Sequence, residues 1–349
     1  MPLPPPTRSF VRWGIIGCGD VTEKKSGPAF NLVPDSHLVA VMRRDGAKAA
    51  DYARRHGVPR WYDNAQALVN DPEVDAIYVA TPPNAHLDGA LLAAAAGKPA
   101  YVEKPMARHT PECDRMIAAF AAANLPLYIA YYRRALPRFV ELKQLLDSHA
   151  LGPLTNLHLR FSQRPRPTHD EAWRVDAATA GGGDFLDLAS HALDLCDWLF
   201  GPLQGGAGHA AKLGPASSPV EDSVALTFHT PTGVPATAQW NFAANAHEDR
   251  FELTGTEGRI TCSVFGDEPL ELIHGDQTKT ISRPNPLHVQ QPLIQTVVDD
   301  LLGRGTCPST GASARRTTVL MDQVLGAYYG GRDDAFWERP ATWPGRIRA

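Results

Sequence analysis

The sequence predicts an N-terminal α/β half built on a parallel sheet, followed by an α+β half with a large open, mostly antiparallel sheet. Over residues 10–130, short apolar runs alternate with helical segments, which is typical of parallel strands joined by right-handed crossovers. Beyond about residue 151, alternating apolar and polar residues recur at hairpin spacing. A chain of 349 residues is also long for one core. We therefore expect two domains, 8–130 and 131–349.

The elements of the first half follow from apolar runs and helical spacing. Strands are expected over 10–16, 37–42, 76–80, 100–103 and 127–130. Helices are expected over 21–31, 47–56, 64–70, 86–96 and 112–123. Gly27-Pro28 should interrupt the first of these helices.

In the second half we expect strands over 154–162, 220–228, 236–242, 250–253, 259–263 and 270–273. Helices are expected over 137–148, 292–302 and 312–329, and the glycine-rich stretch 201–214 is interpreted as a loop. Ala236, Ala238 and Trp240 alternate along one strand, so we expect an uncovered apolar face there. Such a face predicts a homodimer or homotetramer packed sheet to sheet.

Composition excludes several classes of function. The chain is 43% hydrophobic and 21% charged with a net charge of −4, so neither nucleic acid nor an anionic membrane surface is an expected partner. Its cysteines are odd in number and form no CxxC pair, so we expect no metal site and no disulfide framework: Cys18, Cys113, Cys196, Cys262 and Cys307. The proline-rich start lacks the apolar core of a signal peptide, and no apolar run has the length of a membrane span. A cytoplasmic location is the default expectation.

The first motif that carries chemistry is Gly17-x-Gly19-x-x-Thr22, directly after the first strand. Glycines there permit a tight turn and let the backbone approach a pyrophosphate at the start of a helix. The motif predicts a Rossmann dinucleotide-binding domain in place of a plain glycine turn. Its expected cofactor contacts are Gly17, Cys18, Gly19, Asp20 and Val21. Thr22 stands where a third small residue is usual, and leaves the packing of the helix open.

The end of the second strand indicates which dinucleotide binds. An NAD site usually has an acid at this position, whereas the chain has Arg43 followed by Arg44. Guanidinium groups suit the 2′-phosphate of NADP. NADP is therefore the preferred cofactor, and NAD remains the alternative if Asp45 serves as the acid.

Two further strand ends carry polar groups, and ligands of open α/β sheets bind at that edge. Thr81-Pro82-Pro83-Asn84-Ala85-His86 follows the third strand, and Thr81, Pro82, Asn84 and His86 are candidate cofactor contacts. A plain proline turn is the alternative. Glu103-Lys104-Pro105 follows the fourth strand, where Lys104 would reach both cofactor and a substrate oxygen. In isolation, a Lys-Pro turn is usually structural.

The second half holds one more motif, Gly181-Gly182-Gly183 followed by Asp187 and His191. The last two residues are four apart, so a helix would place them on one face. A carboxylate beside an imidazole forms a proton-handling pair if a substrate reaches it. A capped helix with a solvated polar face is the alternative interpretation.

Taken in this order and at this spacing, the glycine turn, Thr-Pro-Pro-x-x-His, Glu-Lys-Pro and Gly-Gly-Gly-x-x-x-Asp-x-x-x-His closely resemble the glucose–fructose oxidoreductase / inositol dehydrogenase / MocA (Gfo/Idh/MocA) family. The resemblance covers about residues 11–328. It implies a substrate cleft between the two domains, with Lys104, Asp187 and His191 lining the hydride-transfer site. It also implies a substrate contact for Arg174. Arg134-Ala135-Leu136-Pro137 matches the family's Arg-x-x-Pro.

The sequence thus predicts an NADP-dependent dehydrogenase or reductase that acts on a CH–OH or C=O carbon of a sugar, polyol or related cyclic compound. Tyr132, at the domain junction, is a candidate substrate contact, with a core position as its alternative. Two rival functions stay open. One is a glycoside hydrolase of the same family that oxidises its substrate transiently, and the other is a cofactor-sensing binding protein without turnover.

Overall fold

The computed structural model describes residues 9–165, 172–214, 218–333 and 335–346. Its internal contacts divide the chain into two compact units. The first takes in the chain up to Ala107, then Glu112–Leu136 and Pro286–Arg315, and the second takes in Arg108–Pro111, Pro137–Asn285 and the chain from Arg316 onward. The single boundary that the sequence predicts after residue 130 does not describe this division, because Arg108–Pro111 belongs to the second unit and Pro286–Arg315 to the first.

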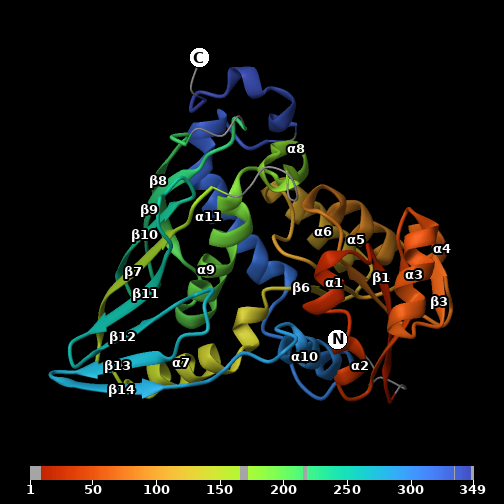
Figure 1. The fold of residues 1–349 in the computed structure, drawn as a ribbon, viewed down its shortest axis with the longest axis horizontal. Coiled ribbons are helices and arrows are strands. Elements are labelled where there is room, and N and C mark those ends of the chain that lie inside the picture. Colours follow the sequence, from red (N-terminus) through yellow and green to blue (C-terminus); the bar gives the residue numbers. More distant parts are fainter. Residues whose placement is uncertain (1–8, 166–171, 215–217, 334, 347–349) are drawn as a thin grey trace. The chain divides into compact units, whose positions relative to one another are not determined.

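The first unit is built on a parallel sheet in the order β3-β2-β1-β4-β5-β6 (Figure 1). Its strands are β1 (Val11–Ile16), β2 (Ser36–Met42), β3 (Arg60–Tyr62), β4 (Ala76–Val79), β5 (Ala100–Val102) and β6 (Leu127–Ile129). Every strand expected in this half is confirmed. The sequence missed β3, because three residues with an arginine and an exposed tryptophan form no apolar run.

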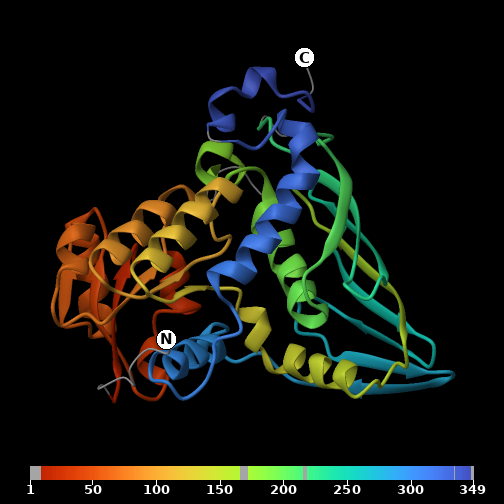
Figure 2. The ribbon, with the colours of Figure 1, turned by 180° about the vertical axis from the view of Figure 1, so that it is seen from behind.

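The helices of this unit are α1 (Asp20–Lys24), α2 (Ala29–Leu32), α3 (Gly46–His56), α4 (Ala65–Val69), α5 (His86–Ala95), α6 (Thr110–Ala122) and α10 (Gln291–Leu301), with 3-10 turns η1 (Pro83–Ala85) and η2 (Tyr132–Ala135). Gly27-Pro28 does split the first helix, as the sequence predicted. One hydrophobic core joins Trp13 and Phe30 to Val297 of α10. A second core packs Val79 against α5 and α6. Helices therefore cover both faces of the sheet, as Figures 1 and 2 show.

The second unit is built on a sheet in the order β14-β13-β12-β11-β7-β10-β9-β8. Its strands are β7 (Leu154–Ser162), β8 (Gln204–Ala211), β9 (Ser223–His229), β10 (Pro235–Asn241), β11 (Glu248–Gly255), β12 (Arg259–Cys262), β13 (Leu270–His274) and β14 (Gln277–Ile281). All neighbours pair antiparallel except β7 and β10, so the mostly antiparallel sheet is confirmed.

The sequence misjudged one strand of this sheet and missed another. The stretch 201–214 is not a loop, because it contains β8. Its glycines serve close approaches: a Cβ on Gly206 would lie 2.1 Å from Leu320 Cδ1, and one on Gly208 would lie 2.4 Å from the Ala225 carbonyl oxygen. The polar strand β14 was missed, because four of its five residues are exposed and give no apolar pattern.

The remaining elements are α7 (Pro137–Asp147), η3 (Ala172–Val175), α8 (Ala177–Ala180), α9 (Asp184–Phe200), α11 (Gly311–Tyr329), η4 (Phe336–Glu338) and η5 (Pro340–Thr342). Helix α9 packs on the sheet, with Phe185 edge-to-face on Trp240 at 5.2 Å between ring centroids. Ala236, Ala238 and Trp240 are therefore buried within the unit. The expectation that they form an uncovered face was wrong, because α9 covers them.

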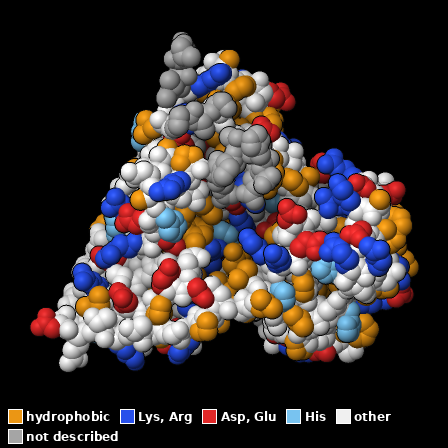
Figure 3. Space-filling model, in the orientation of Figure 1, with side chains coloured by type: hydrophobic (Ala, Val, Ile, Leu, Met, Phe, Trp, Pro, Cys, Tyr) orange, Lys and Arg blue, Asp and Glu red, His pale blue; other side chains and the backbone are white. Residues whose placement is uncertain are grey.

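On the molecular face drawn in Figure 3, acidic and basic side chains are interspersed over both units. This agrees with the near balance of 34 Lys and Arg against 38 Asp and Glu. The proline-rich start and most of the stretch 164–171 lie outside the described residues. Of the helices that the structure describes, none combines the length and the apolar character needed to cross a bilayer.

Candidate active site

The predicted cofactor turn joins β1 to α1. Gly17 has φ +91°, a conformation that favours glycine, and a Cβ there would lie 2.9 Å from the Thr81 side chain. The N–H groups of Gly17 and Cys18 both donate to the Met42 carbonyl, at 2.9 and 3.1 Å. A Cβ on Gly19 would meet only the Gly17 carbonyl oxygen, at 3.9 Å, so that side of the turn is open. This arrangement fits a pyrophosphate placed over the start of α1, beside Asp20 and Val21.

Thr22, the departure from the usual glycine pattern, is buried and hydrogen-bonded. Its hydroxyl donates to the Gly19 carbonyl at 2.7 Å, and its own carbonyl accepts from Tyr52 at 2.9 Å. Burial raises the pKa of the neighbouring Cys18 thiol to about 11, against the opposing charge of Arg43. Cys18 is therefore a neutral packing residue near pH 7.

At the end of β2, Arg43 lies beside the glycine turn, with Nη1 3.4 Å from the Cys18 carbonyl oxygen. Arg44 is exposed. Asp45 has another task, because its carboxylate caps α3 by accepting the Lys48 N–H at 3.2 Å and pairs with Lys48 Nζ at 3.5 Å. The alternative ribose acid is thus already held at the start of α3.

The strand end after β4 contains a polar atom that suits a ligand. Thr81 Oγ1 is buried and has no hydrogen-bond partner among the residues that the structure describes. Leaving a buried hydroxyl unsatisfied costs about 1–3 kcal/mol, so this position fits a polar group of a bound dinucleotide. Pro82 and Asn84 are exposed beside it.

His86 was predicted to contact the cofactor, but its ring is buried against backbone carbonyl groups. Its ring is fully buried, with Nε2 2.8 Å from the Thr81 carbonyl oxygen and Nδ1 3.0 Å from that of Pro105. Burial lowers its pKa, although these carbonyls and Glu103 oppose the shift. His86 therefore ties the Thr81 loop to the loop that follows Lys104.

The end of β5 places Lys104 next to a buried carboxylate. Glu103 Oε1 accepts hydrogen bonds from Tyr78 Oη and Gln290 Nε2, both at 2.5 Å, and Oε2 accepts the Lys104 N–H at 3.1 Å. Gln290 Oε1 in turn accepts from Tyr101 at 2.9 Å. Burial raises the pKa of both tyrosines well above the ordinary value, so they remain neutral donors. The main chain of Lys104 is thereby fixed at the strand end.

Tyr132 lies near this lysine. Burial alone would raise its pKa, but the positive charges of Arg133, Lys25 and Lys104 outweigh that effect, so the pKa lies below its ordinary value. A phenol in this electrostatic environment gives up its proton more readily than a free tyrosine. The sequence indicated a substrate contact for Tyr132, with a core position as the alternative.

In the second unit, Asp187 and His191 lie one turn apart on α9. Arg174 Nη1 donates to Asp187 Oδ2 at 3.0 Å, with the two side chains 23% and 16% exposed. The guanidinium also lies over the Trp173 ring, at 4.4 Å from its centroid. His191 is only 3% exposed. The structure thus brings together Arg174 and Asp187, two of the residues predicted from sequence.

The start of α9 is held by a residue that the sequence did not reveal. Gly183 is the N-cap and offers no side chain, and its N–H donates to Glu221 Oε1 at 3.0 Å. Glu221 also accepts a short hydrogen bond from the Tyr329 hydroxyl. Burial raises the pKa of Glu221, although Tyr329, the Gly183 N–H and Arg332 lower it in part. Contacts over 38 and 108 residues of sequence leave no local pattern.

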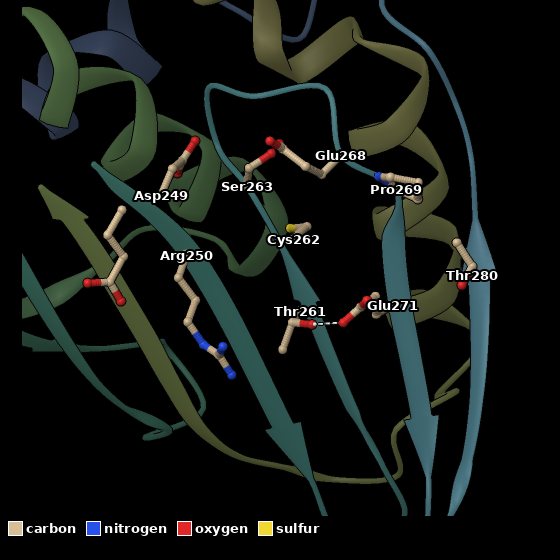
Figure 4. A pocket seen from close by; sticks show the side chains of 10 residues that line it. Asp249, Arg250, Thr261, Cys262, Ser263, Glu268, Pro269, Glu271 and Thr280 are labelled. Carbon is tan, nitrogen blue, oxygen red and sulfur yellow. Dashed lines mark hydrogen bonds between the residues drawn. The ribbon is translucent and has the colours of Figure 1, made fainter. Parts of the chain in front are cut away.

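A cavity of about 520 Å³ opens elsewhere in the second unit, between β11 and β14 (Figure 4). Glu248, Asp249, Glu268 and Glu271 line it together with Arg250, and Thr261 donates to Glu271 at 3.1 Å. The carboxylate of Asp249 has a structural role, because it accepts hydrogen bonds from the N–H groups of three residues: Val264, Phe265 and Gly266. None of the predicted site residues lines this cavity.

Together, the glycine turn, the parallel sheet and the polar strand ends define a nucleotide-dependent oxidoreductase of the Rossmann type. Residues 11–131 match the oxidoreductase family with an NAD-binding Rossmann fold, and residues 139–261 match the GFO/IDH/MocA C-terminal domain. The chain belongs to the Gfo/Idh/MocA family of NAD(P)-dependent oxidoreductases.

Relatives support this assignment along most of the chain. An oxidoreductase of Formosa agariphila is 36% identical over 323 residues, which is 91% of this chain and 99% of that protein. The trans-1,2-dihydrobenzene-1,2-diol dehydrogenase of Bos taurus is 28% identical over 78% of this chain and 80% of its own length. The 1,5-anhydro-D-fructose reductase of Ensifer adhaerens is 28% identical over 71% and 74%.

Solved structures share the fold. A levoglucosan dehydrogenase in complex with NADH superposes with a TM-score of 0.82 at 21% identity, covering 91% of this chain and 96% of that one. A 3-ketoreductase from Actinomadura kijaniata in complex with NADP gives a TM-score of 0.78 at 22% identity, covering 90% and 97%. Neighbours of this fold therefore bind either dinucleotide.

Proposed function

We propose that the chain is an NADP-dependent dehydrogenase or reductase that acts on a CH–OH or C=O carbon of a sugar, polyol or related cyclic compound. The observation that carries the proposal is the pairing of Arg174 with Asp187 on the helix of His191, in a chain whose other unit holds Lys104 at the end of a strand of the parallel sheet. The nicotinamide, when bound, accepts or donates the hydride. The protein supplies positioning and proton transfer.

Lys104 lies close in sequence to the point where the chain passes from the first unit into the second. Arg108 follows Lys104 by four residues, and four residues span at most about 14 Å when extended. A Cβ on Gly181 would lie 2.8 Å from the Arg108 Cα, so this segment packs against the turn that opens α9. Lys104 is therefore tethered by a short segment to the turn that precedes Asp187.

Each side chain then has a defined task. His191 is the general acid and base for the substrate hydroxyl, and Lys104 polarises the same oxygen and shares in proton transfer. Asp187 orients its neighbours, while Arg174 and Tyr132 contact substrate oxygens. The division of proton transfer between Lys104 and His191 is the part that kinetics must decide.

The preference for NADP rests on the end of β2. Arg43 lies beside the glycine turn, where the adenosine ribose of a dinucleotide is bound in Rossmann domains. Asp45 is held by Lys48 at the start of α3, so it is poorly placed to accept from a ribose hydroxyl. These two observations favour the 2′-phosphate over the free hydroxyl.

We propose a homodimer or homotetramer as the assembly, formed through the sheet of the second unit. The face that α9 covers is closed, so the partner would lie on the opposite face, where Ala225, Thr227, Thr237 and Gln239 are exposed. The reducing cytoplasm is the compartment that suits this chain, because the cysteines that the structure describes are buried and form no disulfide.

A spectrophotometric screen tests the activity. Purified protein is assayed at 340 nm with NADP+ or NAD+ against sugars, polyols, levoglucosan and trans-1,2-dihydrobenzene-1,2-diol, and with NADPH or NADH against 1,5-anhydro-D-fructose. We expect turnover with at least one cyclic polyhydroxy compound and higher kcat/KM with the NADP(H) pair. Copurifying cofactor with glycoside cleavage but no net reduction would indicate the hydrolase instead. Cofactor binding without turnover across the panel would indicate the sensor.

A further inference from the structure

Arg332, in the segment after α11, is a buried arginine that makes three directed contacts. Its side chain is 2% exposed. Nε donates to Asp322 Oδ1 at 2.6 Å, Nη1 donates to the Gly181 carbonyl at 2.8 Å, and Nη2 donates to the Arg108 carbonyl at 2.6 Å. One planar group thus holds two backbone carbonyls that lie far apart in sequence.

Those two carbonyls belong to the two segments that carry the proposed chemistry. Arg108 is four residues beyond Lys104, and Gly181 opens the turn that leads into α9 with Asp187 and His191. Gly181 has φ +86°, and a Cβ on it would lie 2.7 Å from the Arg108 carbonyl oxygen. The first glycine of the triplet is therefore required by the approach of the segment that follows Lys104.

Two more contacts strengthen the same junction. Asp322, the partner of Arg332, accepts both the N–H and the hydroxyl of Thr110, at 2.8 and 2.6 Å. The Arg108 side chain donates through Nη1 to the Ala178 carbonyl at 2.8 Å. The segment Arg108–Pro111 is thus held at several points within the second unit, to which it belongs, and Arg332 joins it directly to Gly181.

Burial of this guanidinium has an energetic cost that its contacts must offset. A buried charge needs a partner and satisfied donors, and here Asp322 and two carbonyls provide them. The ring of Phe336 lies 4.5 Å from the guanidinium carbon and adds a cation–π contact. So many directed contacts at the junction of two short loops indicate that the position of one loop against the other must be fixed.

We propose that Arg332 is a positioning residue, which holds the segment continuing from Lys104 against the glycine turn of α9 and so limits the movement of the chain that carries Lys104. This inference has a mechanical half, that Arg332 holds the two segments together, and a catalytic half, that this contact supports turnover. Only the catalytic half rests on the proposed function. Arg332 lies outside the residues matched by either family domain, 11–131 and 139–261. A misplacement of about 1 Å between catalytic groups lowers turnover about 10²-fold, so the coupling has a measurable consequence.

Hydrogen–deuterium exchange of the full-length protein tests the mechanical half without any substrate. In Arg332→Gln, exchange should rise together in the peptides covering 105–111 and 180–187. Arg316→Gln is the matched control, because Arg316 forms a bidentate pair with Asp197 near the C-terminal end of α9, away from the turn that Arg332 contacts. It should leave both peptides unchanged. Asp322→Asn, which disturbs the same junction from its other side, provides a second variant in case Arg332→Gln fails to fold.

A double-mutant cycle tests the catalytic half, with the substrate and cofactor pair of highest kcat/KM in the screen. We expect Arg332→Gln to lower kcat about 10²-fold with little change in the Kd for NADP+, and Arg332→Lys to recover part of the loss. In a Lys104→Ala background, the same substitution should lower kcat less than twofold. A merely structural role would lower kcat by the same factor in both backgrounds, because it would reduce only the folded fraction.

The two halves fail separately. Unchanged exchange in both peptides of Arg332→Gln and of Asp322→Asn overturns the proposal whatever the activity. Raised exchange with equal kcat factors in the two backgrounds also overturns it, since the contact would then be structural alone. If the screen finds no turnover, the proposed function fails, and the joint rise in exchange still decides whether Arg332 couples the two segments.

Discussion

The basis of cofactor choice can be tested by a charge reversal at the end of β2. Arg43→Asp removes the guanidinium beside the glycine turn and places a carboxylate there, where it would repel a 2′-phosphate and accept from a ribose hydroxyl. A hydrogen bond to a charged group contributes about 1.5–3 kcal/mol. Its loss alone predicts that kcat/KM for NADP+ falls about 10- to 100-fold relative to NAD+.

The neighbouring acid supplies the matched control. Asp45 caps α3, and asparagine is an equally good N-cap residue, so Asp45→Asn should keep the helix start intact. If Asp45 has no role at the ribose, this variant will leave the NADP+/NAD+ ratio within about twofold of wild type. The assay is initial-rate kinetics at 340 nm with each cofactor at pH 7. An unchanged ratio in Arg43→Asp, or a large loss of NAD+ activity in Asp45→Asn, would refute the reasoning.

Three further outcomes follow from the geometry. Lys104→Ala and His191→Ala should each lower kcat about 10²- to 10⁴-fold while the Kd for NADP+, measured by fluorescence quenching, stays within a few-fold of wild type; near wild-type turnover in either variant removes that residue from its assigned role. Trp240→Ala should lower the free energy of unfolding by about 3–5 kcal/mol in denaturant titration, because it empties the space between the sheet and Phe185 of α9; a loss below about 1 kcal/mol would contradict that packing. Burial raises the pKa of Glu221 in the folded state, so its contribution to stability is fully present below the unfolded value and is lost as the pH rises through the folded value. Glu221→Gln should therefore cost most near pH 4–5 and least near pH 8, and a cost that grows with pH would show that the shift has the opposite sign.

Sequence patterns predicted this fold well wherever buried segments are apolar. Strands β1 and β4 are recognisable as short continuous apolar runs, and helix α9 is recognisable because its apolar residues repeat at helical spacing. The patterns failed where packing overrides composition. Strand β8 is rich in glycine because neighbours approach its backbone closely, so the sequence favoured a loop. Trp240 suggested an open apolar face, because nothing in its own strand shows that α9 lies over it.

In the candidate site, too, local patterns reveal some residues, whereas others are found only in the folded structure. The residues that we propose to carry the chemistry, such as Lys104 and Asp187, follow strand ends or glycine turns, and local motifs reveal them. The residues that hold them in place, Gln290 and Glu221, have no motif, because each meets its partner across a long stretch of sequence. Glycine spacing showed that backbone comes close to something at 181–183, and only the structure identifies Arg108 and Glu221 as its neighbours.

Buried polar contacts hold the segments on which the proposed catalytic residues lie. Lys104, one of the proposed catalytic residues, lies on a short segment after β5, and a short segment has little rigidity of its own. Rigidity must then come from buried polar contacts such as those of Glu103 with Gln290, and of Gly181 with Arg332. Both supporting residues come from the last quarter of the chain, far from the motifs they hold. Under the proposed function, substitutions at Gln290 and Arg332 should lower turnover, although neither residue is proposed to contact a reactant.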